Sequence, residues 1–186
     1  MMNREPLRLT LRGFFVLLIY TNNKSNSIME LNFMAIVVAA IVPLIIGAIW
    51  YNPKVMGTAW MKASGMTEEK MKTGNIGVIF GVTLLLSVML AFTVNGMVIH
   101  QIAAEQLAFT NPDAESFKAF MAEFGNVHRN FGHGALHGAI GSIFFVLPVL
   151  GINALFERKG WKYILINVGY WTIALAAMGS ILCGWK

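Results

Sequence analysis

The chain has 186 residues, of which 56% are hydrophobic and only 12% are charged. Soluble domains carry about twice that share of charged residues, so the composition argues against a water-soluble globule and against a disordered chain. The single cysteine, Cys183, excludes an intrachain disulfide and a cysteine-based metal site. The net charge of +5 comes from thinly spread Lys and Arg residues that form no basic stripe, which argues against nucleic acid as a partner.

Residues 1–28 are predicted to be a leader or peripheral segment outside the core. They contain Arg4, Arg8 and Arg12 and an apolar run, 13–20, that is too short to cross a bilayer. The A-x-A-like cleavage site of a signal peptide is missing after that run. We therefore expect the natural start at Met29, with an N-terminal interfacial helix or a signal peptide as the alternatives. Deleting residues 1–28 should then leave membrane insertion and stability unchanged.

Four long stretches of the remaining chain contain no Asp, Glu, Lys or Arg. Each is long enough to cross a hydrocarbon core of ~30 Å as a helix, which takes about 20 residues. Helices are expected because backbone polar groups in lipid must find partners within their own segment. The sequence thus predicts an all-α, polytopic membrane protein, with residues 29–186 forming one four-helix domain. The stretches are Asn32–Tyr51, Asn75–His100, Gly132–Phe156 and Tyr163–Trp185.

The loops between these stretches predict the orientation of the bundle. The first and third loops are rich in Lys and Arg, whereas the long second loop has more acidic than basic residues. By the positive-inside rule, the two basic loops face the cytoplasm, so the core N- and C-termini and the second loop lie on the outer side of the membrane. The basic residues are Lys54, Lys62, Lys70 and Lys72 in the first loop and Arg158, Lys159 and Lys162 in the third.

Both longer loops show patterns typical of short amphipathic helices. In the first loop, Thr67 is a candidate N-cap that precedes two acidic residues. In the second loop, Asn111 and Pro112 predict the start of a helix that Gly125 ends. Between them runs an apolar stripe at helical spacing, which consists of Phe117, Phe120, Met121 and Phe124.

Small residues predict where the membrane helices touch. The second stretch opens with Gly77-x-x-x-Gly81, and the third contains Gly134-x-x-x-Gly138. Such pairs let two helix backbones approach closely, which stabilises helix association in lipid. We expect them to form a compact bundle, either within one chain or in a homo-oligomer.

The four histidines gather toward the expected outer side of the bundle. His133 and His137 are spaced i, i+4, so they share a helix face, a spacing that suits two metal ligands. A third donor would come from His100, Glu105 or Glu123, because a metal ion needs three or four ligands. The alternative is that the histidines are structural and only form hydrogen bonds with their neighbours.

Four other polar residues lie within the expected spans: Asn95, Asn153, Asn167 and Tyr170. The first interpretation is hydrogen bonding between helices, with Asn153 and Asn167 at similar depth and bonded to each other. The alternative is a polar ligand site that these residues share.

The remaining absences bear on function. The spans carry no ionisable residue other than histidine, whereas ion-coupled carriers usually place one there. Ser-His-Asp sets, phosphate loops and nucleotide fingerprints are missing too, so we expect no catalytic residue and no cofactor. The first hypothesis is a non-catalytic binding or scaffolding bundle. A transporter or channel for a small neutral solute or metal is the alternative, followed by a metal-dependent membrane enzyme.

Several short sequence motifs occur together in this chain. They are Asn32–Ile36, Gly47–Pro53, Gly57–Lys62, His137–Gly138, Ile152–Glu157 and Ile166–Trp171. Together they resemble a bacterial membrane family catalogued as domain of unknown function 1761, over about residues 30–185. The resemblance implies a membrane location and the four-span fold. It implies no activity, because the family has none established.

Overall fold

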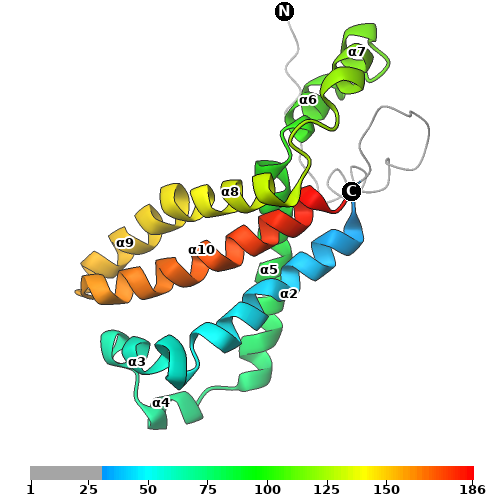
Figure 1. Cartoon of the computed structure of the whole chain (residues 1–186). Helices are drawn as coiled ribbons and strands as arrows, with labels where there is room; N and C mark the ends of the chain where they lie inside the picture. Colours follow the sequence, from blue (N-terminus) through cyan, green and yellow to red (C-terminus); the bar gives the residue numbers. More distant parts are fainter. Residues whose placement is uncertain (1–30) are drawn as a thin grey trace, which may run out of the picture.

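The computed structural model describes residues 31–186, and every regular element within them is a helix (Figure 1). Four helical segments are long and apolar enough to cross a bilayer, so the predicted all-α class with four membrane spans is confirmed. The expectation for the leader, residues 1–28, lies outside the described residues. The four segments are α2 (Phe33–Trp50), α5 (Ile76–Val98), Phe131–Phe156 and α10 (Trp161–Gly184).

The third segment is interrupted by one wider turn. It consists of α8 (Phe131–Gly141), the π-helical η3 (Ser142–Val146) and α9 (Leu147–Phe156). Pro148 follows the wide turn, and its missing N–H cannot close the ordinary helical bond to the preceding turn. The Ser142 hydroxyl lies 3.0 Å from the Thr172 hydroxyl of α10, so the break is held against the neighbouring helix.

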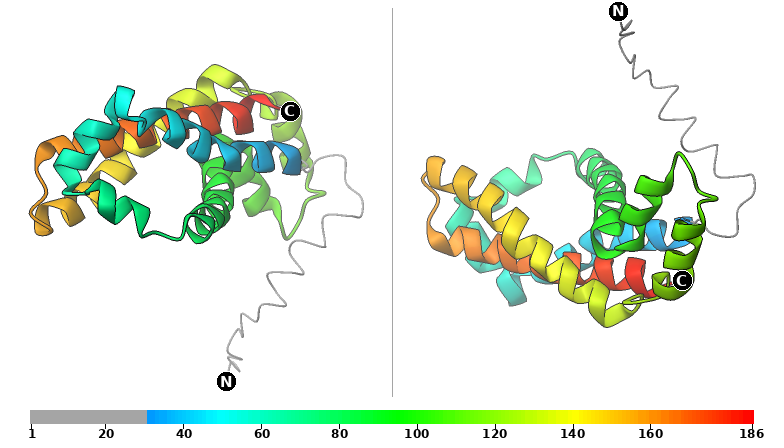
Figure 2. Two further views of the ribbon diagram at one scale, coloured as in Figure 1. Left: turned by 90° about the horizontal axis from the view of Figure 1, so that it is seen from below. Right: turned by 90° about the horizontal axis from the view of Figure 1, so that it is seen from above.

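Helix α10 forms the centre of the bundle, where it packs against α8, α2 and α5 (Figures 1 and 2). The glycines of the third segment allow this packing. A Cβ atom on Gly138 would lie 2.0 Å from the Leu175 carbonyl oxygen, and one on Gly134 would meet Gly179 at the same distance. The predicted contact at Gly134 and Gly138 is therefore made within one chain. By contrast, a Cβ atom on Gly81 of α5 would meet nothing within 4 Å.

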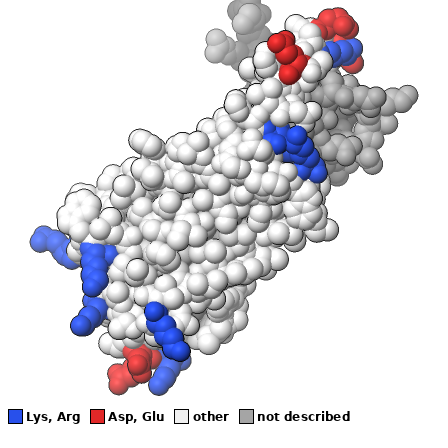
Figure 3. Space-filling view, in the orientation of Figure 1, with Lys and Arg blue, Asp and Glu red and all other residues white. Residues whose placement is uncertain are grey.

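Charged side chains lie at the two ends of the bundle and leave a broad uncharged band between them (Figure 3). The first loop, at one end, contains η2 (Pro53–Gly57), α3 (Thr58–Ser64) and α4 (Glu68–Lys72). Lys159 of the third loop donates from Nζ to the Ser64 carbonyl at 2.7 Å, so both basic loops share this end. The uncharged band is what a chain that crosses a bilayer must present to lipid.

The structure confirms the predicted start of the helix in the first loop and corrects the start of the helix in the second loop. Thr67 caps α4 as predicted, because its hydroxyl accepts a hydrogen bond from the Lys70 N–H at 3.2 Å. The predicted start of the outer helix at Asn111 and Pro112 is wrong, since α7 runs from Glu115 to Phe124. The reason is a turn, in which the Ala114 N–H bonds the Asn111 carbonyl before the helix begins. A further short helix, α6 (Gln101–Ala108), precedes this turn.

Candidate metal centre

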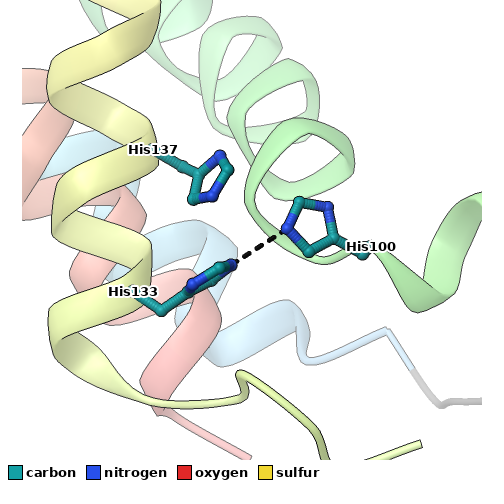
Figure 4. A group of neighbouring side chains, drawn as sticks. All are labelled: His100, His133 and His137. Atoms are coloured by element: carbon teal, nitrogen blue, oxygen red, sulfur yellow. Dashed lines mark hydrogen bonds between the residues drawn. The ribbon is translucent and has the colours of Figure 1, made fainter. Parts of the chain in front are cut away.

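Three histidines come together from two elements at the end of the bundle opposite the basic loops. His133 and His137 lie one turn apart on α8, whereas His100 sits at the junction of α5 and α6. Asn130 caps α8, because its Oδ1 accepts a hydrogen bond from the His133 N–H at 2.8 Å. Since the glycine face of α8 packs against α10, the adjacent histidine face is turned toward the end of α5 (Figure 4).

The ring nitrogens of the three histidines converge on one point. One nitrogen from each of His100, His133 and His137 lies within 4.8 Å of the other two. The closest pair is His133 Nε2 and His100 Nε2, which are 3.0 Å apart. The structure thus places His100, one of the candidate third donors, beside His133 and His137. Glu105 and Glu123, the alternative third donors, are not part of this group.

The fourth histidine borders the group without joining it. The ring of His128 stacks on that of His133, with 4.8 Å between centroids and 15° between planes. His128 has a positive φ of 63°, a conformation that is uncommon for residues other than glycine. The His128 ring therefore lies beside His133 while the residue remains exposed.

The lone cysteine ties together the backbones that carry these histidines. Cys183 Sγ lies 3.4 Å from the Val98 carbonyl, two residues before His100, and 3.3 Å from the His128 carbonyl. Arg129 adds a bond from its Nε to the Cys183 carbonyl at 3.1 Å. Burial lowers the pKa of the Arg129 guanidinium, although an arginine remains charged at neutral pH. The end of α10 thus positions both parts of the histidine group.

The spacing of the nitrogens is close to that of metal ligands. Zinc–imidazole bonds of about 2.0–2.1 Å in a tetrahedral site place two ligand nitrogens roughly 3.3 Å apart. The separation of 3.0 Å between the Nε2 atoms of His100 and His133 lies near that value. The His137 ring faces both of these rings, with centroids 4.8 Å from that of His100 and 4.3 Å from that of His133. Three imidazoles also leave one coordination position open for water or another ligand.

The asparagines and Tyr170 do not form a shared site. The predicted bond between Asn153 and Asn167 is wrong, because Asn167 Oδ1 accepts from the Tyr51 hydroxyl at 2.9 Å and its Nδ2 donates to the Tyr163 carbonyl at 2.7 Å. Asn153 lies exposed on α9, and Asn95 is buried on α5.

Tyr170 and Tyr51 instead form bonds that join α2 to α10. The Tyr170 hydroxyl donates to the Pro43 carbonyl at 2.9 Å. Burial raises the pKa of the Tyr51 phenol well above its ordinary value, and the nearby phenols of Tyr170 and Tyr163 raise it further. Tyr51 therefore stays protonated and can donate to Asn167. The interpretation of these residues as interhelical contacts fits this part of the bundle.

Comparison with known proteins identifies a family. The family described as protein of unknown function DUF1761 matches residues 34–183, which is most of the chain. The chain belongs to the DUF1761 family. The resemblance seen in the sequence motifs is thereby confirmed, and the matched region covers the four membrane spans except for Phe33 and Gly184, together with all four histidines. No curated protein and no solved structure matches the chain.

Proposed function

We propose that this DUF1761 protein is a membrane protein that binds a divalent transition metal ion through His100, His133 and His137. The convergence of one nitrogen from each ring to within 4.8 Å is the observation that supports this proposal. His133 Nε2 and His100 Nε2 are at hydrogen-bonding distance, 3.0 Å, so the two rings already face each other. Three imidazoles that share one point are a donor set that metal ions bind well.

The donor set favours particular ions. Imidazole nitrogen suits Zn²⁺, Cu²⁺, Ni²⁺ and iron, whereas Mg²⁺ and Ca²⁺ prefer oxygen ligands. The three donors contain no carboxylate. We therefore expect Zn²⁺ or Cu²⁺ to bind and Mg²⁺ or Ca²⁺ not to compete at similar concentrations.

The charge distribution supports a position for this site in the cell. The two basic loops lie together at one end of the bundle, where Lys and Arg side chains gather (Figure 3), whereas the histidines lie at the start of α8 and the end of α5 (Figure 4). The positive-inside rule then places the histidines at the outer face of a bacterial inner membrane, with the core N- and C-termini outside. Metal would reach the site from outside the cytoplasm.

We infer binding rather than catalysis or solute transport. The three-histidine group contains no carboxylate that could act as a general base. Transport of a neutral solute through the bundle would need a shared polar pathway. Asn95, Asn153 and Asn167 lie apart and give no support to such a pathway.

A metal titration of the purified full-length chain tests the proposal. The protein should carry an affinity tag without histidine and be titrated with Zn²⁺ by calorimetry in detergent. We expect one ion per chain, with binding weakened at least tenfold in His133→Gln and His100→Gln. Glu123→Gln is the matched control, because it removes a nearby donor outside the group, and it should bind as the wild type does. Equal affinity for Zn²⁺ in the wild type and in His133→Gln would contradict the proposal.

A further inference from the structure

A long apolar groove runs along the bundle between α5, α9 and α10. Its volume is about 750 Å³, and Leu90 and Met97 of α5 line one wall while Phe145, Val149 and Trp171 line the other. Phe145 and Val149 are 72% and 51% exposed, so the groove opens sideways toward the lipid. A groove of this kind in a membrane protein must be filled, because an empty apolar cavity loses contacts on every wall.

One end of the groove is lined by polar side chains. Asn153, Glu157 and Tyr163 line this end. In the part of the chain that the structure describes, their side-chain amide, carboxylate and hydroxyl groups make no hydrogen bond or ion pair. Groups of this kind at a membrane boundary are expected to bind water or the polar part of a ligand. The groove is therefore apolar along its length and has hydrogen-bonding groups at one end.

The turn next to that polar end is basic. Arg158 and Lys162 flank the turn between α9 and α10, and within residues 31–186 neither forms an ion pair. The first loop meets this turn, because Lys159 bonds the Ser64 carbonyl, and Lys and Arg side chains gather at this end of the bundle (Figure 3). Phosphate is the group that this charge attracts at a membrane surface.

The size of the groove decides what can occupy it. Small-molecule sites span about 300–1,000 Å³, and a groove of 750 Å³ falls in that range. An acyl chain can lie along its apolar walls while a polar head meets its polar end.

We propose that the groove binds one glycerophospholipid, with an acyl chain along the apolar walls and the head beside Arg158 and Lys162. The glycerol region then meets Asn153 and Tyr163. Glu157 supplies a negative charge next to these two basic residues. A head that carries both a phosphate and an ammonium group can therefore pair with the basic residues and with Glu157. Phosphatidylethanolamine has that combination. The acyl chain points toward Met97, which lies three residues before His100. The lipid head and the histidine group are therefore at opposite ends of the bundle.

Native mass spectrometry of the full chain in mild detergent, with phosphatidylethanolamine added, tests the proposal. We expect one lipid to remain bound to the wild type. Val149→Trp fills the groove and should reduce the retained lipid at least fivefold. Ile152→Trp is the matched control, because Ile152 is exposed on the same helix but does not line the groove, and it should retain the lipid. Thermal unfolding of both variants in detergent checks that each is folded.

A second variant tests the position of the head. Glu157→Gln should weaken phosphatidylethanolamine binding several-fold and leave phosphatidylglycerol binding unchanged, because only the first lipid carries an ammonium group. Equal retention of phosphatidylethanolamine in Val149→Trp and Ile152→Trp would overturn the proposal, as would a wild type that retains no lipid or only a free fatty acid. Equal loss of both lipids in Glu157→Gln would overturn the placement of the head. None of these outcomes depends on bound metal.

Discussion

The Nε2 atoms of His133 and His100 lie 3.0 Å apart, although the two residues are separated by a loop that contains two short helices. Their meeting depends on the close approach of α8 to α10 and on the way α5 ends beside them. The structure links a packing feature, the glycine face of α8, to the geometry of a potential metal ligand set. The predictions below test that packing, the polar contacts behind it and the position of the bundle in the membrane.

Gly138→Ala is expected to destabilise the bundle, because its Cβ would lie 2.0 Å from the Leu175 carbonyl oxygen. Overpacking of this kind costs about 1–3 kcal/mol. In a chain of this size, each kcal/mol lowers the melting temperature by roughly 2–4 °C. Thermal unfolding in detergent measures the effect. Gly81→Ala is the control and should melt like the wild type, since its Cβ meets nothing within 4 Å.

Tyr51→Phe is expected to change how stability depends on alkaline pH. Burial raises the pKa of Tyr51 above its ordinary value of 10.0, so the folded state keeps a proton that the unfolded state loses. The stabilisation is complete below about pH 10 and is lost as pH rises toward the folded-state pKa. Unfolding of the wild type and Tyr51→Phe should be compared between pH 8 and 11. The stability difference should shrink at high pH, and a constant difference would argue against a buried phenol.

Ala114→Cys is expected to react with a membrane-impermeant maleimide on intact cells, because the second loop should lie outside. The native Cys183 is fully buried and should not react in the folded protein. Lys70→Cys, in the first loop, is the matched control and should react only after the cells are permeabilised. The opposite pattern of labelling would mean that the bundle is inserted the other way round.

The four spans could be predicted because a bilayer imposes length and the absence of charge on each segment. Their bounds follow for the same reason, with the second stretch ending two residues early at Val98. The pairing of His133 and His137 was also predictable, because an i, i+4 spacing fixes one helix face. The helix cap at Thr67 was predictable as well, because it depends on a hydrogen bond between residues that are close in the sequence.

The other features depend on contacts between distant segments. Both glycine pairs look alike in the sequence, yet only Gly134 and Gly138 meet another helix in this chain. Asn153 and Asn167 have similar depth but different neighbours, because the Tyr51 hydroxyl donates a hydrogen bond to the Asn167 side chain. The groove has no signal in the sequence, since its walls come from three helices whose separation depends on packing. For the same reason, the roles of Trp171 and Glu157 emerge only from the fold.

X-ray absorption spectroscopy of the Zn²⁺-loaded protein shows which atoms hold the metal ion. Three imidazoles should give nitrogen ligands at about 2.0–2.1 Å with the outer-shell scattering of histidine rings. That scattering should be weaker by about one ring in His137→Gln and unchanged in Glu123→Gln. A spectrum with only oxygen ligands, or one identical in the wild type and His137→Gln, would contradict the account.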